Sequence, residues 1–277
     1  MASAFSSLPT VYSYYLKNYY RSKSFYLIFI LVVLASALMI YLSIHYLPKI
    51  DSLFPSQTSV PRELKEKVVL YLWSYVLSDL PVFAAVFFSS PAISSEIENR
   101  TAFHIFSLPV DRGILLMGKY LAASSATIIT MAFFVGAEIG TVEYLFPGLP
   151  LPPIFSSIAL LVVFIFAISA FTFMLSSIFN KNLYSYITTF IIYLIVFNVT
   201  NIILQVLYSY NAFFLLDNAA SIIERIFLNV NPSVFGGTMS INGAPISSVL
   251  LSLAVMFLYI VISLIISLIV FERKEVK

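Results

Sequence analysis

The sequence predicts an all-α integral membrane protein with six transmembrane helices. Hydrophobic residues make up 60% of the 277 residues and charged residues only 10%, and the mean hydropathy is +0.98. This composition excludes an ordinary soluble domain and a disordered chain. The chain also divides into six apolar runs, each close to or above the roughly 20 helical residues needed to cross hydrocarbon, and polar turns separate them.

The first element, residues 1–24, is predicted to be an interfacial helix. Tyr12, Tyr15, Leu16 and Tyr19 recur at helical spacing, and cations lie on the other faces. Such a helix places its aromatic rings at the level of the lipid headgroups and its cations near the phosphates. A disordered aromatic tail is the alternative interpretation.

A single transmembrane domain, residues 25–277, follows this helix. Its first span is predicted to be uncleaved, because the polar region before it is too long for a signal peptide. The polar stretch 48–67 is expected to be an exposed outer loop that leads into the second span. The spans are expected at about 25–47, 72–93, 112–140, 154–179, 183–208 and 246–271.

Four polar residues within the spans are candidates for a substrate path. Asp79 directly precedes a Leu-Pro pair, so it can cap a restarted helix or lie at a kink. A carboxylate at membrane depth is functional by default, although near an interface it can simply be hydrated. Asn198, Asn201 and Gln205 share one helical face. They either hold the bundle together by hydrogen bonds or line a strip that faces a substrate path or a partner subunit.

The stretch 94–121 joins the second and third spans and combines charge, helix signals and a proline. An amphipathic helix is predicted to begin with Ser94 or Ser95 as its N-cap, with acidic residues in the first turn. It is expected to end near Ser107, because Pro109 disfavours helical geometry at the preceding residue. The stretch therefore forms a short helix across the mouth of two spans.

The distribution of lysine and arginine predicts the orientation. With the N-terminus inside, ten of the 15 lysines and arginines fall in inner segments and five in outer ones. The positive-inside bias then places both termini and the stretch 94–121 in the cytoplasm. Lys119, which follows the candidate N-cap Asp111 in the third span, is expected to snorkel to this inner surface.

Residues 211–245 lie outside in this topology. Leu216, Ala220, Ile223 and Phe227 repeat at helical spacing, while Asp217, Ser221 and Glu224 line another face. This pattern predicts a short amphipathic helix in the outer interface. Glycine and proline turns follow it.

Several classes of function are excluded. The chain has no cysteine, so disulfides, thiol catalysis and zinc-thiolate sites are absent. The spacing from Gly113 to Lys119 matches a phosphate-binding loop, but Tyr120 replaces the magnesium ligand. His45 and His104 lack the neighbours of a metal or protease site. A net charge of +2 does not indicate nucleic acid as a partner.

The stretch between spans two and three resembles the corresponding loop of type-2 ATP-binding-cassette permeases. In that family the usual sequence pattern is an acidic pair, Gly-Thr, a leucine-rich turn, Pro-Val and Gly-Lys. Arg100 stands where glycine is common. The matching residues here are Glu96 and Glu98, Arg100-Thr101, Ser107-Leu108-Pro109-Val110, Arg112 and Gly118-Lys119.

This resemblance implies a cytoplasmic coupling helix that docks on a separate ATPase subunit. From the residues alone, the same helix could equally float on the headgroups. The resemblance favours docking, with an aromatic face in a groove of the ATPase and charges at its rim. The expected docking residues are Glu96, Glu98, Arg100, Phe103, Phe106, Leu108, Pro109 and Arg112.

The resemblance also implies the rest of the transporter. ATP and magnesium are expected in the partner ATPase, and no cofactor or enzymatic activity is expected in this chain. The chain is expected to pair with a second copy or a related permease in the cell membrane and to work as an exporter. Relatives fold the outer segment before the last span as re-entrant helices.

Two other functions remain open from the sequence. The chain can be a membrane anchor or assembly subunit of a larger complex, without a transport path. It can also be a secondary transporter, which would need ion ligands in mid-membrane and would work without ATP. Loss of Asp79 or of the polar face of the fifth span should matter to a transport path but not to an anchor.

Overall fold

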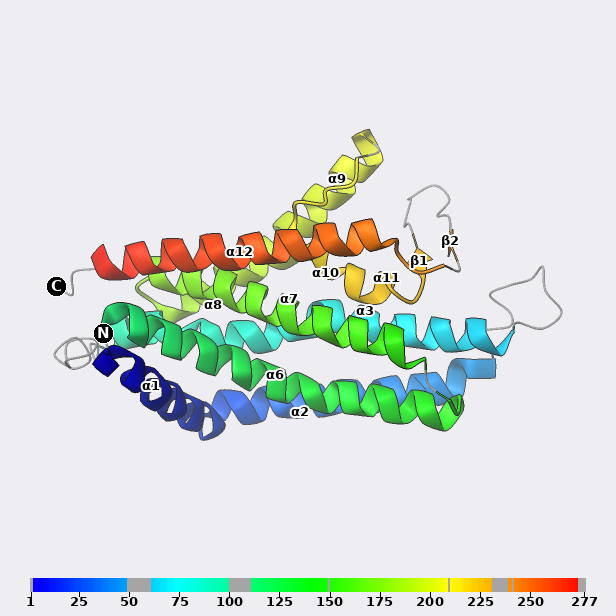
Figure 1. Cartoon of the computed structure of the whole chain (residues 1–277), viewed down its shortest axis with the longest axis horizontal. Coiled ribbons are helices and arrows are strands. Elements are labelled where there is room, and N and C mark those ends of the chain that lie inside the picture. The colour runs from blue at the N-terminus through cyan, green and yellow to red at the C-terminus, as the bar shows by residue number, and fades with distance from the viewer. Residues whose placement is uncertain are drawn as a thin grey trace.

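The computed structural model describes residues 2–48, 61–99, 111–148, 150–208, 210–230, 239–240 and 242–273, and it is a helical bundle (Figure 1). The six predicted long apolar helices are present, each long and apolar enough to cross a membrane. They are Lys23–Tyr46 (α2), Arg62–Glu98 (α3 and α4), Arg112–Leu145 (α6), Leu151–Ile178 (α7), Asn182–Tyr208 (α8, η2 and α9) and Ile246–Arg273 (α12).

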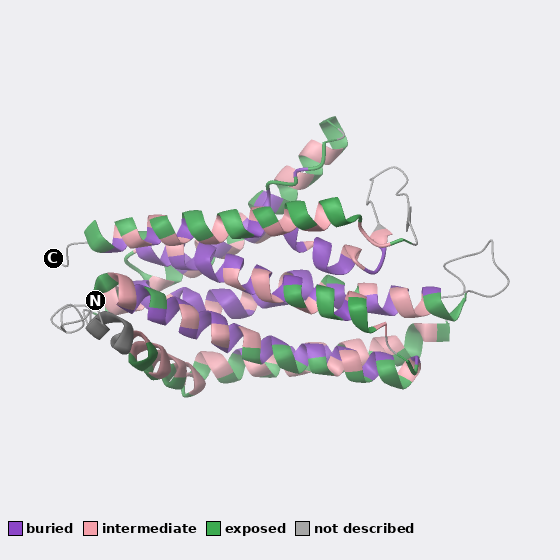
Figure 2. Ribbon diagram, in the orientation of Figure 1, coloured by how far each residue is buried: buried purple, intermediate pink, exposed green. Residues whose placement is uncertain are grey.

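The core of the bundle is formed by α3, α6 and α7, whose most apolar stretches are 67%, 56% and 67% buried. The helix α2, the α8–α9 span and α12 lie at the periphery (Figure 2). Only 11–17% of the most apolar stretch of each is buried, and their apolar side chains are exposed outward. Trp73 on α3 is fully buried, packs against Phe134 on α6 and donates a hydrogen bond to Ser43 Oγ on α2 at 2.9 Å. Burial of such large apolar side chains stabilises the bundle.

The predicted N-terminal helix is α1, Ala2–Tyr20, and it packs along α6. The contact is close: a Cβ atom at Gly118 would lie 2.6 Å from Val11 Cγ1. Tyr15 and Tyr19 face the bundle, where Tyr15 reaches α4 and Tyr19 meets Phe88 of α3 edge-on. These rings therefore pack on protein, whereas the sequence placed the aromatic face among lipid headgroups.

The helix α3, Arg62–Ser89, begins earlier than predicted and runs without a break. Residues 62–67, predicted to be part of an outer loop, form its first turns. Glutamate and lysine favour helix, and Pro61 occupies the N-cap position. Pro81 lies inside the helix, so Asp79 does not cap a restarted helix. Most of the remaining predicted loop, residues 49–60, lies outside the described residues.

The fifth span changes its winding midway. The helix α8, Asn182–Phe190, is followed by a π-helical segment, η2 (Ile191–Phe197), and by α9 (Asn198–Tyr208). A π-helical segment is wider than an α-helix and often marks a functional site. From there α9 diverges from the other helices (Figure 1), and none of its residues is buried in the chain.

The segment between α9 and α12, which we call the outer segment after its predicted position, forms two short helices and a small strand pair in its described residues, where the sequence predicted one interfacial amphipathic helix. The helices α10 (Leu216–Ala220) and α11 (Ile222–Arg225) are mostly buried. The first packs against α12 and the second against α3 and α7. Strands β1 (Asn229–Val230) and β2 (Met239–Ser240) pair antiparallel. The predicted helical periodicity is present. Its polar side faces the protein rather than solvent, since Glu224 on that side is buried.

Candidate functional site

The helix α4, Pro91–Glu98, continues from α3 through Ser90. The N-cap prediction at Ser94 or Ser95 is therefore wrong: Ser90 keeps helical dihedrals and proline is tolerated in the first helical turn. Both predicted caps lie inside the helix. The Ser94 hydroxyl donates to the Ser90 carbonyl at 2.7 Å, and the Ser95 hydroxyl donates to the carbonyl of Pro91.

A buried ion pair joins α4 to α6. Lys119 is 0% exposed, pairs with Glu96 Oε2 and donates to the Ala92 carbonyl at 3.1 Å. Its ammonium also lies 5.0 Å from the centre of the Tyr15 ring, a cation–π contact. The predicted snorkelling of Lys119 to the surface is wrong, because a carboxylate, a carbonyl and an aromatic face compensate its charge inside the protein.

The same carboxylate holds α1. The Tyr15 hydroxyl donates to Glu96 Oε1 at 3.1 Å. Burial, and then the negative charge of Glu96, raise the pKa of Tyr15 well above its usual value. The hydroxyl thus stays protonated and remains a donor at physiological pH. One carboxylate therefore ties α4 to both α1 and α6.

On its other side, α4 is bound to α7 and α8. Ser176 Oγ of α7 accepts from the amides of Ile93 and Ser94 at 3.3 and 3.1 Å and donates to the Ser90 carbonyl at 2.6 Å. Glu98 Oε2 accepts from the Asn182 amide at the start of α8 at 2.9 Å. These contacts and the Glu96 contacts define the α4 junction, which joins α4 to α1, α6, α7 and α8.

The start of α6 is bound to the last helix. Asp111 occupies its predicted N-cap position, but its side chain makes no capping hydrogen bond. Arg112 Nη1 donates to the Glu272 carbonyl of α12 at 2.8 Å. The ends of α3–α4, α6, α7 and α12 nearest this site and the N-terminal end of α1 lie together at one end of the molecule (Figure 1).

Of the eight predicted docking residues, the structure places Glu96, Glu98 and Arg112. Glu96 is 15% exposed and points toward the bundle, while Glu98 and Arg112 are exposed. The other five lie outside the described residues: Arg100, Phe103, Phe106, Leu108 and Pro109.

The four predicted path residues do not form one cluster of hydrogen bonds. Asn201 Oδ1 accepts from Asn218 Nδ2 of α10 at 3.3 Å, so it binds the outer segment rather than another span. Asn198 is exposed, and Gln205 and Asp79 are half-buried.

Sequence reasoning missed four members of the α4 junction: Tyr15, Lys119, Ser176 and Asn182. A signal existed for Lys119, since the Gly-Lys pair was part of the resemblance. Gly118 lets α1 approach α6, and Lys119 reaches the carboxylate of α4. Ser176 and Asn182 carry no pattern that distinguishes them from other polar residues of apolar helices.

Six apolar spans around a buried core define a multi-pass membrane protein, and the α4 junction gives it a rigid connection at one end. The chain belongs to a transporter family: the model of the ABC-2 family transporter proteins matches residues 11–276. It is thus a transmembrane permease subunit of an ABC transporter, as the sequence predicted. A search of curated proteins found no match.

Proposed function

We propose that this permease is an exporter subunit, and that the α4 junction transmits the movement of a partner ATPase to the spans. The observation that carries the proposal is that α4 is bonded to four helices at once, through Glu96, Glu98 and Ser176. A force on the segment that follows α4 reaches α1, α6, α7 and α8 together. Packed elements respond to such a force as rigid bodies.

The expected contact with the ATPase is the segment 98–112. Its predicted face consists of Phe103 and Phe106, flanked by Arg100, Leu108 and Pro109, with Glu98 and Arg112 exposed at its two ends. Aromatic residues in a groove are a common mode of helix recognition. Glu96 does not contact the ATPase in this scheme; its ion pair with Lys119 holds α4 to α6. ATP and magnesium bind the ATPase in this scheme.

A second permease copy, or a related chain, completes the transport path. Support comes from α9, which has no buried residue and carries exposed Asn198. A polar side chain facing hydrocarbon is costly, and a partner helix removes this cost by hydrogen bonding. Asp79, Asn201 and Gln205 are the further polar residues proposed for the path.

The proposed orientation in the cell membrane has both termini and α4 in the cytoplasm. The cysteine-free chain allows a direct test. Asn180→Cys, in the turn before α8, should react with an impermeant maleimide only from the cytoplasmic side. Tyr144→Cys, 78% exposed at the other end of α6, should react only from outside. The reverse pattern contradicts the proposal.

The coupling itself is tested by purifying the permease with its ATPase from native membranes. Glu98→Lys combined with Phe103→Ala and Phe106→Ala should lower both the recovery of the ATPase and the ATP hydrolysis of the complex at least tenfold. Glu143→Lys, a charge reversal at the opposite end of the bundle, is the matched control. Recovery and hydrolysis at wild-type levels in the triple variant would refute the docking face.

The anchor alternative is separated by the path residues. Asp79→Asn and Asn198→Leu should leave the assembly with the ATPase intact but reduce ATP-driven export. An anchor would tolerate both changes in both assays.

A further inference from the structure

Three carboxyl groups from three helices lie near enough for their charges to influence one another, and we call Asp79 of α3, Asp217 of α10 and Glu224 of α11 the acidic cluster. The charge of Asp79 affects Asp217, and the charges of Asp79 and Asp217 affect Glu224. Arg225 is the cation that acts on the last two. Two negative charges are left over when all three groups are ionised.

One oxygen of the acidic cluster has no partner. Glu224 is 6% exposed, and its Oε2 is buried with no hydrogen bond in the described part of the chain. A buried polar atom without a partner costs about 1–3 kcal/mol, and more when it is charged. Native proteins tolerate this where a ligand supplies the missing contact. Asp79 and Asp217 are half-buried and therefore reachable.

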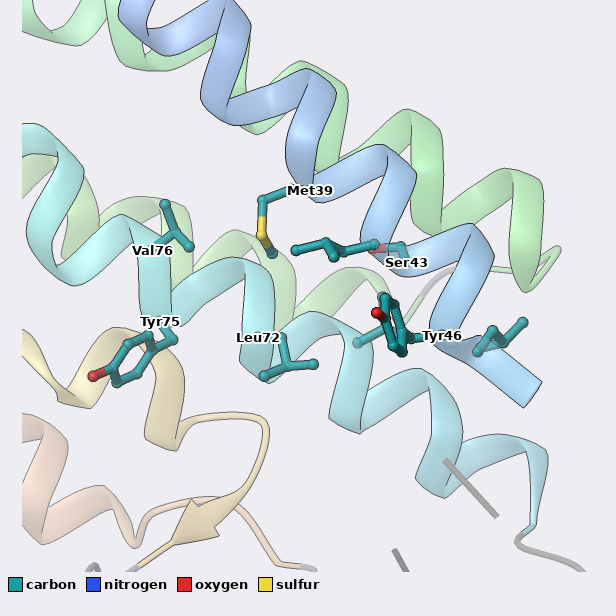
Figure 3. A pocket seen from close by; sticks show the side chains of 9 residues that line it. Met39, Ser43, Tyr46, Leu72, Tyr75 and Val76 are labelled. Carbon is teal, nitrogen blue, oxygen red and sulfur yellow. The ribbon is translucent and has the colours of Figure 1, made fainter. Parts of the chain in front are cut away.

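An apolar groove adjoins the acidic cluster. It lies between α2 and α3 and has a volume of about 430 Å³, within the range of small-molecule pockets. Its walls include Met39, Leu72, Val76 and Tyr75. In Figure 3 the Tyr75 hydroxyl points away from the other wall residues, toward the α10–α11 segment. All three carboxylates act on this hydroxyl, so Tyr75 stands between the groove and the acidic cluster.

We propose that the groove and the acidic cluster together bind an amphipathic organic cation. Its ammonium group lies against the carboxylates beside the Tyr75 ring, and its apolar chain occupies the groove. Tyrosine faces and carboxylates are suited to ammonium groups. A metal ion is not the candidate, because the described residues contain no group of three side chains placed to hold one. The inference rests on the proposed transport function, since it assigns the chemical class of a ligand to this permease.

Binding should depend on pH. Burial raises the pKa of Glu224 to about 8 and that of Asp217 to about 6, so the acidic cluster gains charge between pH 6 and 9 and should bind the cation more tightly as the pH rises. The other titratable and charged groups that interact with its carboxylates are Tyr71 and Tyr75 of α3, Tyr193 of η2 and Arg225 of α11.

The test uses the full chain in phosphatidylcholine nanodiscs, without the ATPase or ATP. Radiolabelled dodecyltrimethylammonium is compared with 1-dodecanol, which has the same chain without the charge. The cation should bind at least tenfold more tightly to the wild type than to the double variant Asp217→Asn with Glu224→Gln. Dodecanol should bind both proteins equally, which also reports that the variant is folded. Glu143→Gln should change neither affinity, and Leu72→Phe should weaken both ligands.

Three outcomes would overturn the proposal. Equal binding of cation and alcohol by the wild type identifies the groove as a site for lipid chains. Equal cation affinity of the wild type and double variant removes the acidic cluster from the site. If neither ligand binds and two copies of the chain cross-link across the groove, the groove is a permease–permease contact. None of these results touches the proposed coupling, which is measured by ATPase recovery and hydrolysis.

Discussion

The α4 junction and the acidic cluster both bury carboxylates at the boundaries between helices, but they differ in what lies opposite. Glu96 in the α4 junction meets the ammonium of Lys119 and the hydroxyl of Tyr15. Glu224 in the acidic cluster has an oxygen without a hydrogen-bond partner in the described part of the chain, and it feels the charges of two further carboxyl groups. A satisfied buried charge holds elements together, whereas an unsatisfied one is suited to a ligand. The comparison predicts opposite responses to neutralisation at the two sites.

The largest effect is expected from Lys119→Met, which leaves Glu96 buried without its cation. Removal of one member of a buried pair costs about 3–5 kcal/mol, so the apparent melting temperature in detergent should fall sharply. The double variant Lys119→Met with Glu96→Leu removes both charges and should recover much of the loss. A double variant as unstable as the single one would contradict the pairing.

A smaller loss is expected where α1 touches α6. In Gly118→Ala the new methyl group overlaps Val11, and overpacking of this kind costs about 1–3 kcal/mol. Gly136→Ala on the same helix is the control, since a Cβ there meets nothing within 4 Å. Adding Val11→Ala to Gly118→Ala should relieve part of the clash and recover part of the lost melting temperature. If both glycine variants melt alike, the close approach of α1 is not important for stability.

Ser176→Ala tests the connection of α4 to α7 and should cost about 1–3 kcal/mol, because two amides lose this acceptor and the buried Ser90 carbonyl loses one of its two hydroxyl donors. Thr172→Ala is the matched control, since that hydroxyl bonds within its own helix, to the carbonyl of Ile168 at 2.9 Å. The loss should also appear as faster hydrogen exchange at Ile93 and Ser94. Unchanged exchange at both amides would contradict it.

At the acidic cluster, the expected effect depends on pH. The melting temperatures of the wild type and Glu224→Gln should differ least at low pH. The pKa of Glu224 is raised in the folded state from 4.5 to about 8. Its contribution to stability is therefore complete below about pH 4.5 and is lost as the pH rises through about 8. The wild type should lose melting temperature relative to the variant between pH 5 and 9. Parallel pH profiles would contradict the shift.

The sequence predicted the six spans because their apolar length is a local property. The residues at the end of the second span also carried the resemblance to the permease family, which the match over residues 11–276 confirms. The sequence did not predict the direction of the α1 aromatic face or the burial of Lys119, since both depend on partners distant in sequence: Glu96 is 81 residues from Tyr15 and 23 from Lys119. The same holds for the acidic cluster. Asp79 was recognised as a candidate, but Asp217 and Glu224 were assigned to an outer amphipathic helix, because periodicity gives a polar face without saying what covers it.

The buried Trp73 has a practical consequence for such experiments. It is the single tryptophan of the chain, and its indole donates to Ser43, which lines the groove. The tryptophan emission of the protein therefore comes from one fluorophore at the boundary of α2 and α3. A shift in emission wavelength or lifetime would register separation of these two helices without any attached dye.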